Sequence, residues 1–227
     1  MTAPFPVMLF AAGRGTRMAP LTDSRPKPLI TVGGRTLLDH ALDLTRVGCV
    51  SRRVANVAYL GDMVRLHLAG RGVAISVEDP VLETGGGLRH ALPLLGHDPV
   101  MTLNTDAVWK GPNPLAVLAD AWRPEMEALL LLVPPVQVKG HTGPGDFSIG
   151  PDGRLTRAPD LIYTGAQIIR TGRLREIDAD VFSLNILWTM MAQTEGLYGV
   201  TYAGQWCDVG RPDSIPVAEA MLQTADV

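Results

Sequence analysis

The chain has 227 residues, of which 46% are hydrophobic, so it can bury a sizeable core as one large domain or two small ones. Its formal net charge of −3 excludes a global basic field, and we therefore expect no nucleic-acid partner. Cys49 and Cys207 are too few for a disulfide framework and no apolar run is long enough to span a membrane, so we expect a cytoplasmic protein with no membrane partner.

The first half of the chain alternates strand and helix patterns. Short apolar runs predict strands at residues 7–11, 53–57, 73–77, 100–103 and 129–133. Apolar positions at helical spacing predict helices at residues 36–47, 61–68, 88–95 and 114–122. Helices of this size between strands imply right-handed crossovers, so we expect an α/β fold with a mostly parallel, twisted sheet flanked by helices.

The pattern changes after Pro134. Residues 139–152 are rich in glycine and proline and are predicted to be mostly loop, and the turn Pro151-Asp152-Gly153 predicts a hairpin between residues 147–149 and 154–156. Further predictions are a strand at 163–169, a helix at 186–192, short sheet-edge strands at 198–202 and 205–209, and a closing helix at 216–222. We expect this second half to be a smaller lid-like region on the same sheet.

The most informative segment begins at the end of the first predicted strand. The strand leads into Gly13-Arg14-Gly15-Thr16-Arg17-Met18, and Pro26-Lys27-Pro28 follows. Glycines let backbone N–H groups approach phosphate oxygens closely, and arginine and lysine supply compensating charge. Lys27 is one of only three lysines, with Lys110 and Lys139, among 20 basic residues. The segment therefore predicts a nucleoside triphosphate site.

This segment differs from two common phosphate-binding loops. No Lys-Ser or Lys-Thr follows the glycines, which excludes the P-loop, and Met18 stands where a dinucleotide-binding loop has its third glycine. A dinucleotide-dependent oxidoreductase would also need an acidic residue at the end of the second strand, where this chain has Asn56 and Val57.

Three more polar segments follow predicted strands, and ligands of open α/β sheets bind at the carboxyl ends of strands. These segments are Glu83-Thr84-Gly85-Gly86-Gly87, Asn104-Thr105-Asp106 and Asp208-Val209-Gly210. Each has a plain structural alternative: Thr84 as a helix cap with glycines for tight packing, and Asp106 and Asp208 as cap or turn residues. The coincidence of four such segments favours a ligand site.

Together these motifs resemble the signature of the sugar-1-phosphate nucleotidylyltransferases, over residues 7 to about 215. Those enzymes join a nucleoside triphosphate and a sugar 1-phosphate into a nucleotide-sugar and release pyrophosphate. The resemblance implies a Rossmann-like nucleotidyltransferase fold in a single domain, 1–227. Within it, residues up to about 134 would bind the nucleotide and residues from about 135 the sugar phosphate.

The resemblance also implies roles for individual residues. It assigns catalysis to Arg17, Lys27, Asp106 and Asp208, with Mg²⁺ bound by Asp106 and Asp208. It assigns nucleotide binding to Ala11, Ala12, Gly13, Arg14, Gly15, Thr16, Arg17, Lys27, Asn56, Glu83, Thr84 and Gly85. It assigns the acceptor sugar phosphate to Asn104, Asp146 and Gly165, although Asp146 could equally be a solvated loop residue.

Three features narrow the substrates: the Leu82–Gly87 run, Trp109 soon after Asp106, and Trp206-x-Asp208-Val209-Gly210-x-Pro212. With the short chain they most resemble the uridylyltransferases that act on N-acetylmuramate 1-phosphate in cell-wall recycling, which implies UTP as the donor. Thr105 departs from the glycine that those enzymes have there. Mannose-1-phosphate guanylyltransferase, glucose-1-phosphate thymidylyltransferase and a non-catalytic nucleotide-binding module remain alternatives. We expect a monomer without a C-terminal β-helix.

Overall fold

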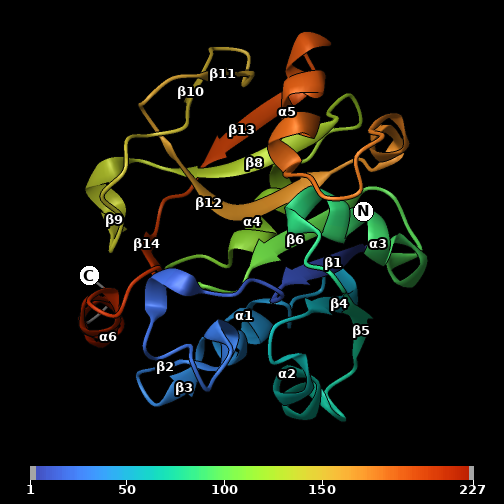
Figure 1. Ribbon diagram of the computed structural model, residues 1–227. Helices are drawn as coiled ribbons and strands as arrows, with labels where there is room; N and C mark the ends of the chain where they lie inside the picture. Colours follow the sequence, from blue (N-terminus) through green and yellow to red (C-terminus); the bar gives the residue numbers. More distant parts are fainter. Residues whose placement is uncertain (1–3, 225–227) are drawn as a thin grey trace.

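The computed structural model describes residues 4–224, and its centre is a seven-stranded sheet in the order β13-β8-β12-β6-β1-β4-β5 (Figure 1). The strands are β1 (Phe5–Phe10), β4 (Val50–Val57), β5 (Val73–Val77), β6 (Val100–Asn104), β8 (Ala128–Val133), β12 (Ile162–Ile169) and β13 (Leu197–Thr201). Strand β12 runs antiparallel to both of its neighbours, and the other neighbouring pairs are parallel. The predicted α/β fold with a mostly parallel sheet is confirmed.

Helices cover both faces of this sheet. They are α1 (Leu37–Leu44), α2 (Gly61–Leu68), α3 (Glu83–Leu95), α4 (Pro114–Ala121), α5 (Leu184–Gln193) and α6 (Ser214–Gln223). Side chains alternate across a strand, so Val7 and Leu9 of β1 pack with α1, α2 and α4, whereas Met8 packs with α3 and α5. Burial of both faces explains why β1 and β8 are unbroken apolar runs.

The order of the strands reverses direction at β1. The chain passes from β1 to β4 and β5 on one side and then returns to β6 on the other side of β1. Phe10, the last residue of β1, lies in register with Asn56 of β4 and with Asn104 of β6. A switch point of this kind leaves a crevice at the carboxyl ends of the strands, where ligands of open α/β sheets bind.

A second, three-stranded sheet corrects one prediction. Residues 205–209 were expected at the edge of the main sheet, as β13 is, but β14 (Gln205–Asp208) lies between β7 (Ala107–Lys110) and β9 (Val138–Lys139). Buried Cys207 and Val209 pack there against α6. The local sequence pattern could not distinguish the seven-stranded sheet from the three-stranded one, because both bury short apolar strands.

Helix α3 begins at Glu83, five residues earlier than the predicted start at 88. Glycine is a poor helix former, but close packing requires it here. A Cβ at Gly86 would lie 2.3 Å from the Asp180 backbone oxygen, and one at Gly87 would lie 2.4 Å from Glu78 Oε1. Tertiary packing therefore overrides the local helix preference, and these glycines are packed tightly, as the structural alternative expects.

The remaining elements are short. The hairpin of β10 (Phe147–Ile149) and β11 (Leu155–Arg157) is confirmed around its predicted turn, and β2 (Thr31–Val32) pairs with β3 (Arg35–Thr36). Within residues 4–224, no helix is long and apolar enough to cross a membrane.

Candidate functional site

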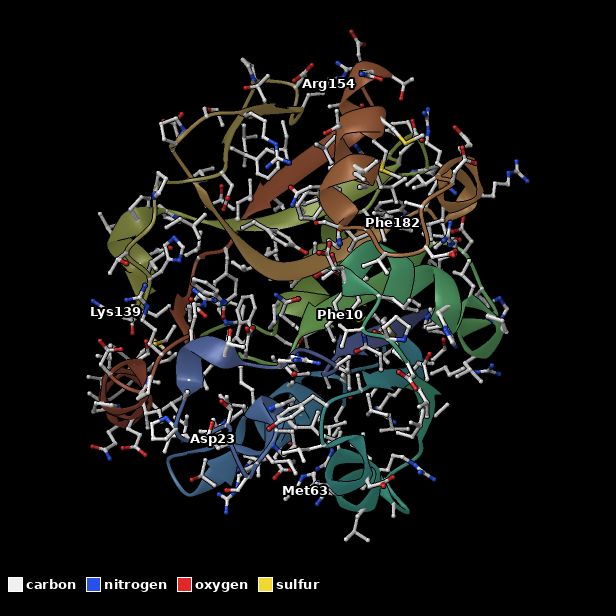
Figure 2. All side chains as sticks on the ribbon, viewed as in Figure 1. Phe10, Asp23, Met63, Lys139, Arg154 and Phe182 are labelled. Carbon is white, nitrogen blue, oxygen red and sulfur yellow. The ribbon has the colours of Figure 1, made fainter. Side chains whose placement is uncertain are left out.

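The switch point carries a cavity of about 200 Å³, here called the inner cavity. Figure 2 shows Phe10 near the centre of the molecule, at the end of β1. The lining residues come from the ends of β1, β4, β5 and β6 and the segments that follow them: Phe10, Ala11, Ala12, Gly13, Lys27, Pro28, Asn56, Glu78, Val81, Glu83, Thr84, Asn104, Thr105 and Asp106. The structure therefore brings together much of the predicted nucleotide-binding set.

The glycine-rich loop after β1 offers backbone donors to this cavity. The N–H groups of Ala12, Gly13 and Arg14 donate to no acceptor within residues 4–224. Gly15 adopts a left-handed φ of 64°, and a Cβ there would lie 2.8 Å from Lys27 Cβ. Glycine is thus required for the loop to pass the lysine stem, and the unpaired N–H groups suit an anionic ligand.

Lys27 and Asp106 form an ion pair within the inner cavity. Lys27 Nζ lies 2.7 Å from Asp106 Oδ2, and the lysine side chain is only 11% exposed. Lys27 begins a short 3₁₀ helix between two prolines, which restricts the backbone from which the side chain extends. The ammonium group is therefore held next to a carboxylate at the edge of the sheet.

Backbone pairing brings Asp208 close to Asp106. Asp208 lies opposite Ala107 in the antiparallel β14–β7 pair, and the Val209 N–H donates to the Asp106 carbonyl oxygen at 2.9 Å. Burial, followed by the charge of Asp106, raises the pKa of the Asp208 carboxyl, whereas Lys27, Arg17 and His141 oppose that rise. The two aspartates come from distant parts of the sequence but share one electrostatic environment.

These two carboxylates fit a magnesium ion chemically. Their oxygens are hard donors, and a divalent cation would relieve the repulsion that raises the Asp208 pKa. Within the described residues, no group of three His, Cys, Asp or Glu side chains could hold a metal ion. Phosphate and water oxygens would have to complete the coordination, as Mg²⁺ prefers.

Six of the residues predicted to bind the nucleotide or to act in catalysis do not line the inner cavity: Arg14, Gly15, Thr16, Arg17, Gly85 and Asp208. Arg14, Thr16 and Arg17 are exposed, and Arg17 lines a separate surface depression with Arg211 and Asp213. The positive charge of Arg17 nonetheless reaches Asp208, because it partly opposes the rise in the pKa of that carboxyl.

Asn56 and Glu78 form a buried polar network under the glycine-rich loop. Asn56 Oδ1 accepts from the Ala11 N–H at 2.7 Å, and Asn56 Nδ2 donates to Glu78 Oε1 at 2.7 Å. Glu78 Oε2 also accepts from the Leu82 N–H at 3.0 Å. Sequence reasoning missed Glu78, although its position directly after β5 was a usable signal.

We expect Glu78→Gln to lower stability by about 1–3 kcal/mol, because an amide has one acceptor oxygen where two buried donors need partners. Loss of this support for Asn56 and Ala11 should raise the KM for the nucleotide more than the KM for the acceptor. Chemical denaturation and steady-state kinetics measure both effects. The matched control is Glu176→Gln, at an exposed position; equal effects in both variants would contradict the role of Glu78.

The start of α3 lies beside the inner cavity, as predicted, but the Gly85 N–H is already hydrogen-bonded within the protein. Glu83, with a left-handed φ of 60°, and Thr84 line the cavity. The Gly85 N–H, expected to be free for a ligand, donates to the Phe182 carbonyl oxygen at 2.9 Å, because the loop before α5 packs there. The Thr84 hydroxyl accepts from the Leu184 N–H at 3.0 Å, so it does not cap α3.

A second cavity, of about 290 Å³, adjoins the first and is here called the outer cavity. It shares Phe10, Thr84 and Asn104 with the inner cavity and is otherwise lined by Asp146, Arg157, Tyr163, Ser183, Leu184, Asn185 and Trp188. Asp146 Oδ2 accepts from the Tyr163 N–H at 2.8 Å, so this carboxylate is held at the start of β12. Among the residues that line only the outer cavity, the sequence had predicted a role for Asp146 alone.

Gly165 supports the outer cavity from behind Asn104. Its φ is +84°, and a Cβ there would lie 2.7 Å from the Asn104 Cβ. We expect Gly165→Ala to cost about 1–3 kcal/mol of stability and to raise the KM for the acceptor, because Asn104 must move. Thermal unfolding and kinetics test this, with Gly172→Ala, at a position with open space, as the control. An unchanged acceptor KM would contradict the prediction.

Thr105 has a structural role at the meeting of β1 and β6. Its hydroxyl donates to the Phe10 carbonyl oxygen at 2.7 Å, and its side chain lines the inner cavity. The residue that departs from the family pattern thus ties two strand ends together. Trp206 and Cys207 are buried in the small sheet, and burial raises the pKa of the Cys207 thiol to about 12.

Comparison with known proteins agrees with this geometry. Residues 7–147 match the family described as MobA-like NTP transferase domain. An N-acetylmuramate alpha-1-phosphate uridylyltransferase of Caulobacter vibrioides is 41% identical, over 98% of this chain and 99% of its own. An enzyme of the same name from Neisseria meningitidis serogroup B is 33% identical, over 94% of this chain and 96% of its own.

A solved structure shows the same fold. The inositol-1-phosphate CTP transferase from T. maritima superposes with a TM-score of 0.77 at 16% identity, over 98% of this chain and 96% of its own. At that identity the likeness concerns the fold alone. The family match covers more than half of the chain and includes the glycine-rich loop, Lys27 and Asp106. The chain therefore belongs to the MobA-like NTP transferase family and is a nucleotidyltransferase.

Proposed function

We propose that the protein transfers UMP from UTP to N-acetylmuramate α-1-phosphate and releases pyrophosphate. The reaction class is supported by the inner cavity, where the ion pair of Lys27 and Asp106 lies beside unpaired backbone N–H groups, and by Asp208, which strand pairing brings next to Asp106. The substrates are supported by the names of two near-full-length relatives. The single observation that carries the proposal is the placement of Lys27, Asp106 and Asp208 at the switch point of a sheet with this family's fold.

In this proposal the two cavities divide the substrates. The loop from Ala11 to Thr16 binds the triphosphate, through the backbone N–H groups of Ala12, Gly13 and Arg14, and Asn56, Glu83 and Thr84 border the nucleotide. Asn104 and Asp146 bind the acceptor, and Gly165 supports Asn104. Residues to about 134 thus serve mainly the nucleotide, and residues from about 135 mainly the sugar phosphate.

The chemical task is to bring one anion against another. The acceptor phosphate is already a nucleophile at neutral pH, so the protein must position it and neutralise charge rather than remove a proton. Lys27 stabilises charge on the phosphates, and Arg17 adds positive potential from the surface side. Asp106 and Asp208 would hold Mg²⁺, which when bound supplies Lewis-acid stabilisation of phosphate charge.

The test is a matrix of four nucleoside triphosphates against N-acetylmuramate, mannose, glucose and N-acetylglucosamine 1-phosphates, scored by pyrophosphate release. We expect the highest kcat/KM for UTP with N-acetylmuramate α-1-phosphate. A preference for GTP with mannose 1-phosphate, or for dTTP with glucose 1-phosphate, would replace the proposed substrates. No turnover in any combination, with nucleotide binding retained, would indicate a non-catalytic module.

We also propose that the protein acts in the cytoplasm as a monomer. Two cysteines, both free, are compatible with a reducing compartment. Sedimentation at micromolar concentration tests the oligomeric state.

A further inference from the structure

The outer cavity contains a cation that the proposed reaction does not use. Arg157, the last residue of β11, lines this cavity and forms no ion pair with a carboxylate within residues 4–224. Arg154, on the same hairpin, is paired with Asp152 and Glu195 instead. A guanidinium without an anionic partner, at the wall of a substrate cavity, is available to an anionic group of the ligand.

Neighbouring side chains fix the orientation of this guanidinium. Arg157 Nη2 donates to Asn185 Oδ1 at 2.6 Å, and the guanidinium carbon lies 4.3 Å from the centre of the Phe147 ring and 5.8 Å from that of Trp188. The Phe147 and Trp188 ring centres are themselves 6.1 Å apart, so both rings lie on one side of the guanidinium. Within residues 4–224 its other N–H groups donate to no acceptor, and a guanidinium with free N–H groups can bind a carboxylate. Asn185 is thus a positioning residue for Arg157.

The location of Arg157 argues against a role at the reacting phosphate. Lys27 and Asp106 line the inner cavity and not the outer one, whereas Arg157 lines the outer cavity and not the inner one. The two cavities meet at Phe10, Thr84 and Asn104. An acceptor whose phosphate reaches the lysine therefore extends its sugar substituents toward Arg157.

We propose that Arg157 binds a carboxylate on the acceptor sugar and is the residue that selects for it. This inference rests on the proposed function for the identity of the acceptor. N-acetylmuramate differs from N-acetylglucosamine by an ether-linked lactyl group, which ends in a carboxylate. Other sugar 1-phosphates with neutral ring substituents have no group that requires this cation. Arg157 thereby determines specificity without taking part in nucleotidyl transfer.

The experiment compares wild-type protein with Arg157→Gln on three acceptors: N-acetylmuramate α-1-phosphate, its lactyl amide, and N-acetylglucosamine 1-phosphate. For the first acceptor we expect KM to rise about 10- to 100-fold, the range for a lost charge-assisted hydrogen bond, with kcat and the KM for UTP within about twofold. The two neutral acceptors should show no such rise. For Arg157→Lys we expect an intermediate KM for N-acetylmuramate α-1-phosphate, because lysine keeps the positive charge but lacks the planar guanidinium that can bind both carboxylate oxygens.

The control is Arg154→Gln, which removes the same charge from the same hairpin. Figure 2 shows Arg154 at the outer end of this region, well away from Phe10. We expect this variant to retain the wild-type KM for all three acceptors. An equal KM rise for all acceptors in Arg157→Gln would assign Arg157 to the phosphate and overturn the inference, as would no rise at all.

Direct binding separates this inference from the proposed function. Calorimetry with N-acetylmuramate α-1-phosphate alone reports the contact with Arg157 even if no nucleotidyl transfer occurs. Binding that weakens about 10-fold or more in Arg157→Gln, without turnover in the wild type, would support the inference and refute the proposed reaction. Equal binding by both proteins, or no binding by the wild type, would overturn the inference whether or not transfer to another acceptor is found.

Discussion

Replacing Asp106 with asparagine is expected to lower the kcat for pyrophosphate release about 100- to 1,000-fold, the usual cost of removing one electrostatic stabiliser of a transition state. The amide keeps the side chain's size and can still accept a hydrogen bond from Lys27, so the fold should survive. The residual rate should lose its dependence on millimolar Mg²⁺, because one of the two proposed ligands is gone. Rates over a Mg²⁺ titration measure both effects.

Two comparisons make this result specific. Asp208→Asn should behave in the same way, and the double variant should be little slower than either single one, because the two groups act as a unit. Asp62→Asn, at a carboxylate that is 93% exposed on α2, should retain the wild-type rate. Full Mg²⁺-dependent activity in Asp106→Asn would remove Asp106 from the proposed metal site.

Lys27→Met is expected to lower kcat by a similar factor, about 100-fold or more, because the methionine keeps the buried stem but removes the ammonium group that faces the phosphates. Asp106 then loses its counter-charge, so the apparent affinity for Mg²⁺ should rise while turnover falls. A rise in Mg²⁺ affinity together with a fall in turnover distinguishes Lys27 from a residue that merely supports the fold. The Mg²⁺ dependence of single-turnover rates measures both quantities.

The matched control for Lys27→Met is Lys139→Met, because the Lys139 side chain is exposed on β9 and lines neither the inner nor the outer cavity. It should leave both kcat and the Mg²⁺ dependence unchanged. Normal turnover in Lys27→Met would show that the ion pair with Asp106 is structural, with no part in binding the triphosphate.

Sequence pattern predicted most of the elements because the physics behind it is local. Strands buried on both faces must be apolar along their length, which identified β1, β6 and β8 to within a residue or two. Helix α2 and strand β5 match their predicted limits. The sequence also located the glycine-rich loop and Asp106 at the carboxyl ends of predicted strands, because each comes just after such a strand. Lys27 was singled out by the two prolines that flank it.

Other features depend on contacts between residues that are far apart in the sequence. Glycines predicted as a loop lie inside α3, since Asp180 and Phe182 pack where side chains would be. Arg17, which the motif assigns to the phosphates, lies on the surface outside the inner cavity. No local signal specifies which neighbour an element will pack against.

The sequence by itself determined the α/β fold, the family and the glycine-rich loop with Lys27 and Asp106. Only the tertiary structure decided which groups meet. Asp208 lies beside Asp106 because β14 pairs with β7 in a separate sheet, and Arg157 reaches the outer cavity because Asn185 and two aromatic rings hold it there. Composition and periodicity report burial along the chain, whereas strand register and packing set the distances between side chains that chemistry requires.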